Sequence, residues 1–313
     1  MPCEEQPAIF RVDVRVGARP DIGFLAPDLG SPHALNYLAG AERSLPGGLL
    51  AGLNYSGAYT WNALLGTDLN RRAGDLLDGR LDRLNPSFGA MNGVWNGNVI
   101  HYNALIATLR RDLARGFGLQ ASYTLSKTTD LVQAGTRQNR DGPYSIPDQH
   151  SIENLQSYAD WDVRHRSTLT GLWHISAPTS ARRAIGRLLS GWEITCVTIL
   201  QRSTPFTVIN RSPFDPILDA GGRVIGLQPD SGDYNVDGYN YDFPNTPARN
   251  FTGSHTRRQF IDGVFTAADF PVPTPGTQGN LKRNTFRNPG LLNVDAGLIK
   301  NNRALLLKEN LNV

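Results

Sequence analysis

The chain has 313 residues and a net charge of +3, and its 20 prolines and 32 glycines favour many turns over long helices. Only 40% of the residues are hydrophobic and the mean hydropathy is -0.33, so no apolar segment approaches the roughly 18 residues that a membrane-spanning helix needs. Acidic and basic residues are mixed along the sequence, which gives no argument for a nucleic-acid partner. These numbers exclude a helical membrane protein and favour a turn-rich β protein.

A first hairpin is expected between residues 37 and 61. Residues 37–45 are followed by the turn residues Pro46, Gly47 and Gly48, and along residues 49–61 apolar residues alternate with polar or small ones. Turn chemistry between two such runs predicts a pair of antiparallel strands. A long connection, roughly residues 62–98, follows.

A second hairpin is expected from residues 99–111, a short turn at 112–116 and a strand at 117–127. The alternation in the last strand is strict, and successive side chains of a strand point to opposite faces. One face would carry Phe117, Leu119, Ala121, Tyr123 and Leu125, and the other Gly118, Gln120, Ser122, Thr124 and Ser126. The sheet therefore has one apolar face and one polar face.

The second half of the chain repeats the arrangement with longer connections. A polar connection at about 128–161 precedes a strand at 167–175, and a link at about 177–190 leads to a strand at 191–208. The longest connection, about 209–289, precedes a strand at 292–300, and a turn at 301–303 opens a final strand that ends at Val313. Short and long connections thus alternate.

This pattern predicts an all-β fold, an antiparallel up-and-down transmembrane β-barrel portion of about eight strands, with long extracellular loops and short periplasmic turns. The aromatic residues near strand ends fit interfacial girdles; they are Tyr59, Trp61, Tyr123, Trp173 and Trp192. A soluble β-sandwich with these aromatics in its core is the alternative. Connections beyond about 12–15 residues are uncommon in compact soluble domains, which argues against it.

The chain divides into an N-terminal segment, residues 1–36, expected as a loop or incomplete strand, and the barrel portion, residues 37–313. The start of the sequence lacks the basic residues, apolar core and cleavage site of a secretory signal. Together with the barrel pattern, this predicts a fragment whose signal and upstream domains are missing.

The best candidate for specific chemistry is a calcium loop. Oxygen-bearing side chains at relative positions 1, 3 and 5 with glycine at 6 match the first half of an EF-hand-type loop, but position 12 is Pro244 and not the bidentate glutamate. The candidate ligands are Asp233, Asn235, Asp237 and Asp242. A calcium loop that orders an extracellular segment and a solvated polar turn are both open.

Catalysis has no positive support in the sequence, so we do not expect an enzyme. His165 lies between Arg164 and Arg166 at a strand start, and we interpret the three as loop-base hydrogen-bonding residues. No nucleophile elbow, phosphate-binding loop or dinucleotide fingerprint is present.

Several segments in order resemble the Oar-like TonB-dependent outer-membrane receptors. They are YNAL at 102–105 with LRR at 109–111, GFGLQASYTLSK at 116–127, DVRHR at 162–166, LLSGW at 188–192, QRSTPFT at 201–207, NTFRNPG at 284–290 and NVD at 293–295. The resemblance implies a barrel of about 22 strands with a plugged lumen, of which this chain supplies the last third or so.

The resemblance further implies an outer-membrane location, contact with outer-membrane lipid and transport of an unknown large substrate by energised displacement of the plug. The TonB complex would act through N-terminal parts that we do not find here. No cofactor is implied apart from the calcium considered above. The alternative function is a soluble, secreted, calcium-dependent β-rich binding or adhesion module, in which the apolar face would be buried rather than exposed.

Overall fold

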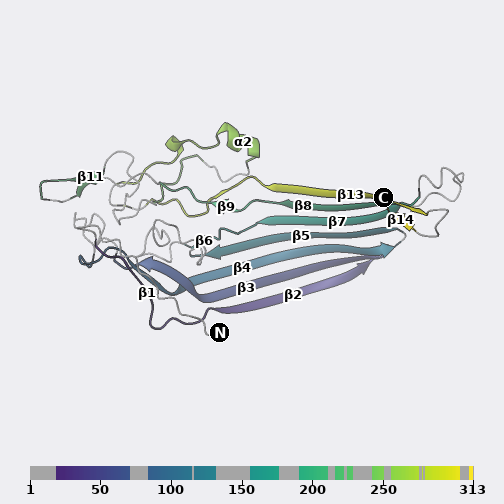
Figure 1. Ribbon diagram of the computed structural model, residues 1–313, viewed down its shortest axis with the longest axis horizontal. Coiled ribbons are helices and arrows are strands. Elements are labelled where there is room, and N and C mark those ends of the chain that lie inside the picture. Colours follow the sequence, from purple (N-terminus) through teal and green to yellow (C-terminus); the bar gives the residue numbers. More distant parts are fainter. Residues whose placement is uncertain are drawn as a thin grey trace, which may run out of the picture.

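A computed structural model describes residues 19–70, 84–114, 116–131, 156–175, 190–210, 216–221, 224–227, 242–249, 255–274, 277, 279–303 and 310–312. Its main feature is one sheet of long strands lying side by side (Figure 1). Eight strands follow one another in chain order with antiparallel pairing, and we call them the wall. They are β2 (His33–Leu45), β3 (Leu49–Asp68), β4 (Met91–Ala114), β5 (Phe117–Asp130), β7 (His165–Ile175), β8 (Trp192–Gln201), β13 (Leu291–Arg303) and β14 (Asn310–Asn312). The expected all-β, up-and-down arrangement is confirmed.

Short turns join wall strands at one end, which we call the turn end. Gly47, Gly48 and Gly116 have φ angles of 81°, 74° and 79°, a region that glycine adopts without steric cost. At Gly116 a Cβ would also lie 2.7 Å from the carbonyl oxygen of His174 on β7. The connections between β3 and β4, β5 and β7, and β8 and β13 lie at the opposite end, which we call the loop end (Figure 1).

The strand pairing places all the predicted apolar residues on one face. Ala121 of β5 lies opposite Leu109 of β4 and Leu169 of β7, and the same row continues through Thr198 of β8 to Val294 of β13. We call this side of the wall the apolar face and the other side, with Gln120 and Ser122, the polar face. The face assignment made from the alternation is therefore confirmed by the register.

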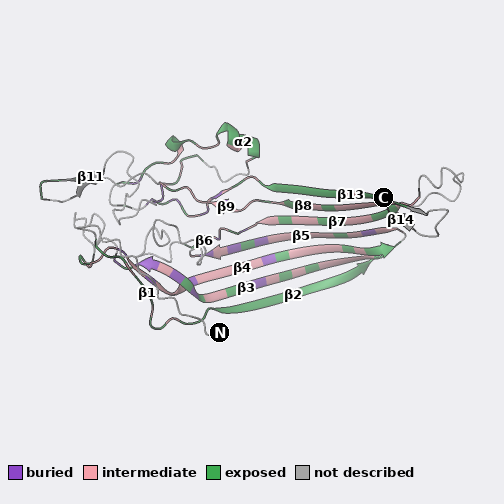
Figure 2. Cartoon of the chain, in the orientation of Figure 1, coloured by how far each residue is buried: buried purple, intermediate pink, exposed green. Residues whose placement is uncertain are grey.

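Large side chains of the apolar face are exposed, not packed in a core. Leu53 is 52% exposed, Trp173 50% and Leu200 54%, and exposed positions recur along the wall strands (Figure 2). Within the described residues the wall is a single layer, with no second sheet packed against these side chains. The soluble sandwich would need the same aromatic and aliphatic residues buried.

Three wall strands are longer than the sequence pattern predicted. β3 continues past Trp61 to Asp68, β4 begins at Met91 and β5 continues to Asp130, so the connection expected at 62–98 is shorter. The cause in β3 is a bulge: Asn62 has a φ of 56°, and the register with β4 shifts between Thr60 and Leu64. Beyond the bulge the exposed positions change from odd to even numbers, because an extra residue reverses the alternation.

Two short strands extend the sheet at the loop end. β1 (Ile22–Leu25), within the segment 1–36, pairs in parallel with the first residues of β4. β6 (Ser157–Tyr158) pairs with the end of β5. The N-terminal segment and the connection between β5 and β7 therefore each add one short strand to the sheet at the loop end.

The connection between β8 and β13 carries further short elements. They are β9 (Pro205–Phe206), β10 (Pro216–Leu218), β11 (Val224–Leu227), α2 (Arg257–Asp262), a 3-10 helix (Ala267–Asp269) and β12 (Phe286–Arg287). A capping box between Thr256 and Gln259 starts α2, and Gly263 ends it in the left-handed conformation. These elements are too short to produce a periodic pattern. Among the described residues, no helix has the length and hydrophobicity that crossing a membrane requires.

Candidate functional site

A small aromatic core folds the β8–β13 connection at the loop end. Phe243, Leu281 and Phe286 are buried at its centre. Phe286 lies opposite Phe206 in the β9–β12 pair, with 5.8 Å between the ring centroids. The partly buried residues packed around this centre are Phe206, Val208, Val264, Phe265 and Phe270. This core holds β12, and the residues around it, against the end of the wall.

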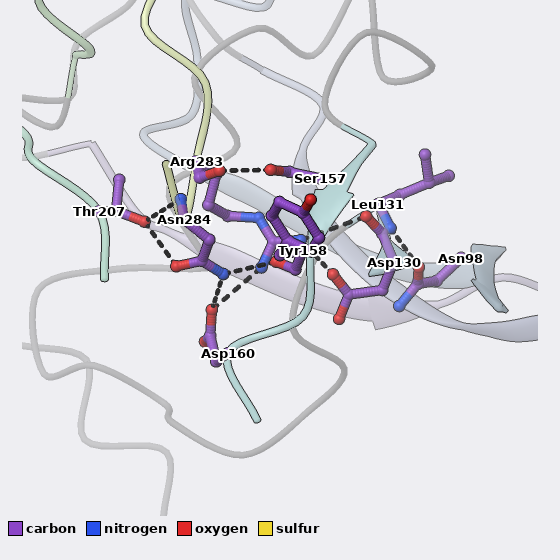
Figure 3. A network of polar contacts seen from close by, with 9 residues as sticks. All are labelled: Asn98, Asp130, Leu131, Ser157, Tyr158, Asp160, Thr207, Arg283 and Asn284. Carbon is purple, nitrogen blue, oxygen red and sulfur yellow. Dashed lines mark hydrogen bonds and ion pairs between the residues drawn. The ribbon is translucent and has the colours of Figure 1, made fainter. Parts of the chain in front are cut away.

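Two buried ion pairs join that connection to the wall. Arg283 donates to the carboxylate of Asp130, the last residue of β5, and at 3.1 Å to Asp160 (Figure 3). Arg287 donates to the carboxylate of Asp162. Asp130 and Asp162 are both fully buried, and a buried charge is tolerated only when it is paired and hydrogen-bonded. These pairs therefore determine how the long connection sits on the wall.

Further hydrogen bonds make the second pair part of a network. Asp162 also accepts a hydrogen bond of 2.6 Å from the backbone N–H of Thr128. Arg287 donates to the carbonyl oxygens of Asp162 and Ser203, at 3.1 and 3.3 Å, and its guanidinium lies 5.1 Å from the ring centroid of Tyr158. One guanidinium thus joins the β5–β7 connection to the start of the β8–β13 connection.

Asn284 completes this network from the left-handed backbone region, which asparagine adopts more readily than most other non-glycine residues. Its φ is 59°, and its side chain donates to the carbonyl oxygen of Tyr158 at 2.6 Å and to Asp160 at 2.5 Å (Figure 3). It also exchanges two 3.0 Å hydrogen bonds with Thr207. We call Asp130, Asp160, Asp162, Arg283, Asn284 and Arg287 the loop-base network.

Three of the segments that carried the family resemblance meet at this network. Residues 162–166, 201–207 and 284–290 are far apart in the sequence, yet Arg287 donates to both Asp162 and Ser203, and Thr207 is hydrogen-bonded to Asn284. The residue pattern alone had not identified Asp130, Asp160 or Arg283. Their only signal was a charged residue close to a strand end, which is common on solvated surfaces as well.

His165 has the role predicted for it. Its Nδ1 lies 2.7 Å from the hydroxyl of Tyr123, and its carbonyl oxygen accepts a 2.9 Å hydrogen bond from the N–H of Arg202. The carbonyl oxygen of Arg164 accepts a 3.0 Å bond from Ser126. The interpretation as loop-base hydrogen bonding is confirmed for His165 and for the backbone of Arg164.

Aromatic residues mark both ends of the apolar face. At the loop end Tyr59 stacks on Trp61, with 5.5 Å between their ring centroids. At the turn end Trp173 is exposed, and the ammonium group of Lys300 lies 5.0 Å from the ring centroid of Trp192. This arrangement is typical of aromatic side chains at two membrane interfaces.

The height of the apolar face can be estimated along β4. His101, which contacts Tyr59 at the loop end, and Arg111, which contacts Phe117 at the turn end, are about 33 Å apart at about 3.3 Å per residue. With a strand tilt of about 40°, the band between them is about 25 Å tall, the height of the lipid-facing band of transmembrane barrels.

The candidate calcium ligands are only partly placed. Asp233, Asn235 and Asp237 lie outside the described residues. Asp242 is buried beside Phe243 of the aromatic core, and its carbonyl oxygen accepts a 2.9 Å hydrogen bond from Asn210. In the parts of the chain that the structure describes, no group of three or more histidine, cysteine or acidic residues is arranged to hold a metal ion.

Comparison with known proteins adds one finding. Residues 3–313 match the family model described as outer membrane beta barrel domain. No curated protein and no solved structure matches the chain. The match covers nearly the whole sequence and agrees with the antiparallel wall, its exposed apolar face and its long connections at one end. The chain therefore belongs to the outer membrane beta barrel domain family and is a protein of the outer membrane.

Proposed function

We propose that this chain forms part of the barrel of a TonB-dependent receptor and takes part in moving a large substrate across the outer membrane. The observation that carries this proposal is the loop-base network. Three segments that resemble the Oar-like receptors, at 162–166, 201–207 and 284–290, meet there through the buried Arg287–Asp162 ion pair and the hydrogen bonds between Thr207 and Asn284. A shared need to anchor a long extracellular connection is a physical reason for the similarity of these segments.

The wall supplies the two surfaces that such a barrel needs. Its apolar face, with Leu53, Leu105 and Leu169 exposed, suits contact with outer-membrane lipid. Its polar face carries hydroxyl and amide groups such as Ser122, hydrogen-bonded to Thr168 at 2.6 Å, and suits a water-filled or plugged lumen. We assign no catalytic step to either face.

We place this wall in a barrel with more strands than those described here. β2 is exposed along its whole length and pairs with β3 alone among the described strands. Unpaired backbone groups cannot be satisfied in hydrocarbon, so in the membrane this edge needs a neighbour. In the proposed receptor, a further strand of the barrel is this neighbour.

An uptake experiment tests the proposal. Cells that produce or lack the protein, each with and without TonB, are supplied with fluorescent peptides, oligosaccharides and iron chelates too large for diffusion pores. We expect at least one probe to enter only when both the protein and TonB are present. Uptake that needs the protein but not TonB would refute the energised mechanism, and equal uptake in all four strains would refute the transport role. The family match gives no support to the alternative of a soluble calcium-dependent module.

A further inference from the structure

A cavity of about 340 Å³ lies at the loop ends of β7 and β8, beside the middle of β5. Its volume is within the range of small-molecule sites. Strand residues, among them Tyr123, Ser167 and Leu200, and residues of the β8–β13 connection, among them Arg202, His255 and Arg287, line it together. The cavity shares Arg287 with the loop-base network.

The register shows on which side of the wall this cavity lies. Tyr123, Ser167 and Leu200 are direct cross-strand neighbours on β5, β7 and β8, and all three belong to the apolar face. Leu200 lies opposite Leu292 of β13, which is 65% exposed. The cavity is therefore bounded by the face that we assign to lipid.

The lining contains arginine but no acidic side chain. No aspartate or glutamate lines the cavity, whereas two arginines and two histidines do. Arg287 is neutralised by Asp162. Arg202 is exposed and forms no ion pair with any residue that the structure describes, so its guanidinium has no counter-ion in the chain described here.

The position along the strand gives the depth. On β8 the side chains of the apolar face run from Trp192 to Leu200, about 26 Å apart along the strand. Arg202 is the first residue after the loop end of β8. The uncompensated guanidinium therefore lies where the apolar band ends, at the level of lipid headgroups, with Leu200 and Tyr123 on its membrane side.

We propose that this cavity binds the phosphate-bearing headgroup of an acidic membrane lipid. The planar guanidinium of Arg202 matches phosphate oxygens with two parallel hydrogen bonds, and the headgroup lies among Ser203, Asn288 and His255. The acyl chains lie along Leu200 and Leu292 of the apolar face. A freely dissolved phosphate would make the same polar contacts but leave these apolar side chains uncovered.

Lipid binding to the full chain tests this assignment. The protein is extracted from outer membranes in mild detergent and titrated with phosphatidylglycerol, with phosphatidylcholine of the same acyl chains, or with inorganic phosphate, and native mass spectrometry counts the bound molecules. We expect tighter binding of phosphatidylglycerol, a loss of about tenfold in Arg202→Gln, as for one charge-assisted hydrogen bond, and a smaller loss in Arg202→Lys. Phosphatidylcholine binding stays unchanged in both variants.

Arg258→Gln is the matched control, because Arg258 lies on α2 in the same connection, is 90% exposed and does not line the cavity. Heat-modifiable mobility verifies the folding of each variant. If Arg202→Gln fails to fold, the salt dependence of wild-type binding replaces it, and a preference for phosphatidylglycerol that is insensitive to salt overturns the proposal. Equal binding by Arg202→Gln and wild type overturns it as well. Inorganic phosphate that binds as tightly as phosphatidylglycerol overturns the lipid assignment in favour of a soluble anion.

Discussion

Replacing Ala121 by arginine is expected to prevent most of the protein from assembling in the outer membrane. Ala121 lies on the apolar face between Leu109 and Leu169. It is four residues from Phe117 at the turn end and eight residues from Thr129 at the loop end of β5. An arginine here would lie inside the lipid-facing band, about a third of the way from its turn end. Because alanine is small, the substitution removes little packing and reports mainly the transfer of a charge into hydrocarbon.

The magnitude follows from this depth. An arginine on the lipid face costs about 2–4 kcal/mol at the bilayer midplane and about 0–1 kcal/mol near an interface. Ala121 lies between these two depths, so we expect a cost of about 1–3 kcal/mol. At 1.4 kcal/mol for each factor of ten, this cost lowers the folded-to-unfolded ratio by about 5-fold to 140-fold. Thr129 lies on the same face of β5 as Ala121, but at the loop end opposite His101. Thr129→Arg should therefore lower the folded-to-unfolded ratio by less than about tenfold.

The matched control is Gln120→Arg on the polar face, where the side chain is exposed. A surface substitution of this kind changes stability by about 0.5 kcal/mol or less. The measurement is the heat-modifiable, protease-resistant fraction in outer membranes, followed by urea titration in lipid vesicles. Equal folded fractions for Ala121→Arg and Gln120→Arg would show that the apolar face does not meet lipid.

Three further predictions concern the connections at the loop end. Asp162→Ala removes the buried carboxylate of an ion pair and should lower the free energy of unfolding by about 3–5 kcal/mol. This loss should make the loop end sensitive to added protease. Asp160 is partly exposed, so Asp160→Ala should increase cleavage much less, and equal cleavage of the two variants would contradict the argument. The backbone N–H and the hydroxyl of Thr266 donate hydrogen bonds to Asp269. These bonds, together with the charge of Arg249, lower the pKa of Asp269. Above pH 3.8, the ordinary pKa of aspartate, Asp269 therefore contributes to stability, and this contribution is lost as the pH falls through the lowered pKa. Protection against protease should fall over this pH range in the wild type, and Asp269→Asn should abolish this dependence on pH. The segment that contains Asp233 and Asp237 should bind calcium only weakly, with a Kd of ~10⁻⁴–10⁻³ M. Calorimetry should detect the heat of calcium binding in the wild type and none in Asp233→Ala/Asp237→Ala. The same heat in both proteins would mean that the segment is only a polar turn.

The wall was predictable because its pattern is local. Alternation with a period of two depends only on neighbouring residues and on the geometry of an extended strand, so the opposite faces of Leu119 and Gln120 could be read directly. Glycines at the turn end likewise identified hairpins through backbone conformation alone. The error at the end of β3 has a local cause as well, since the bulge at Asn62 reverses the alternation.

The loop end was decided by tertiary structure. Asp130 and Arg283 are 153 residues apart, and either could equally have been a solvated charge; only the return of the long connection over the wall buries them as a pair. The same return brings His255 and Arg202 into the lining of one cavity. The sequence by itself determined which side chains share a face, since that depends on strand geometry, whereas the partners of the charged residues depend on contacts between segments that no local pattern encodes.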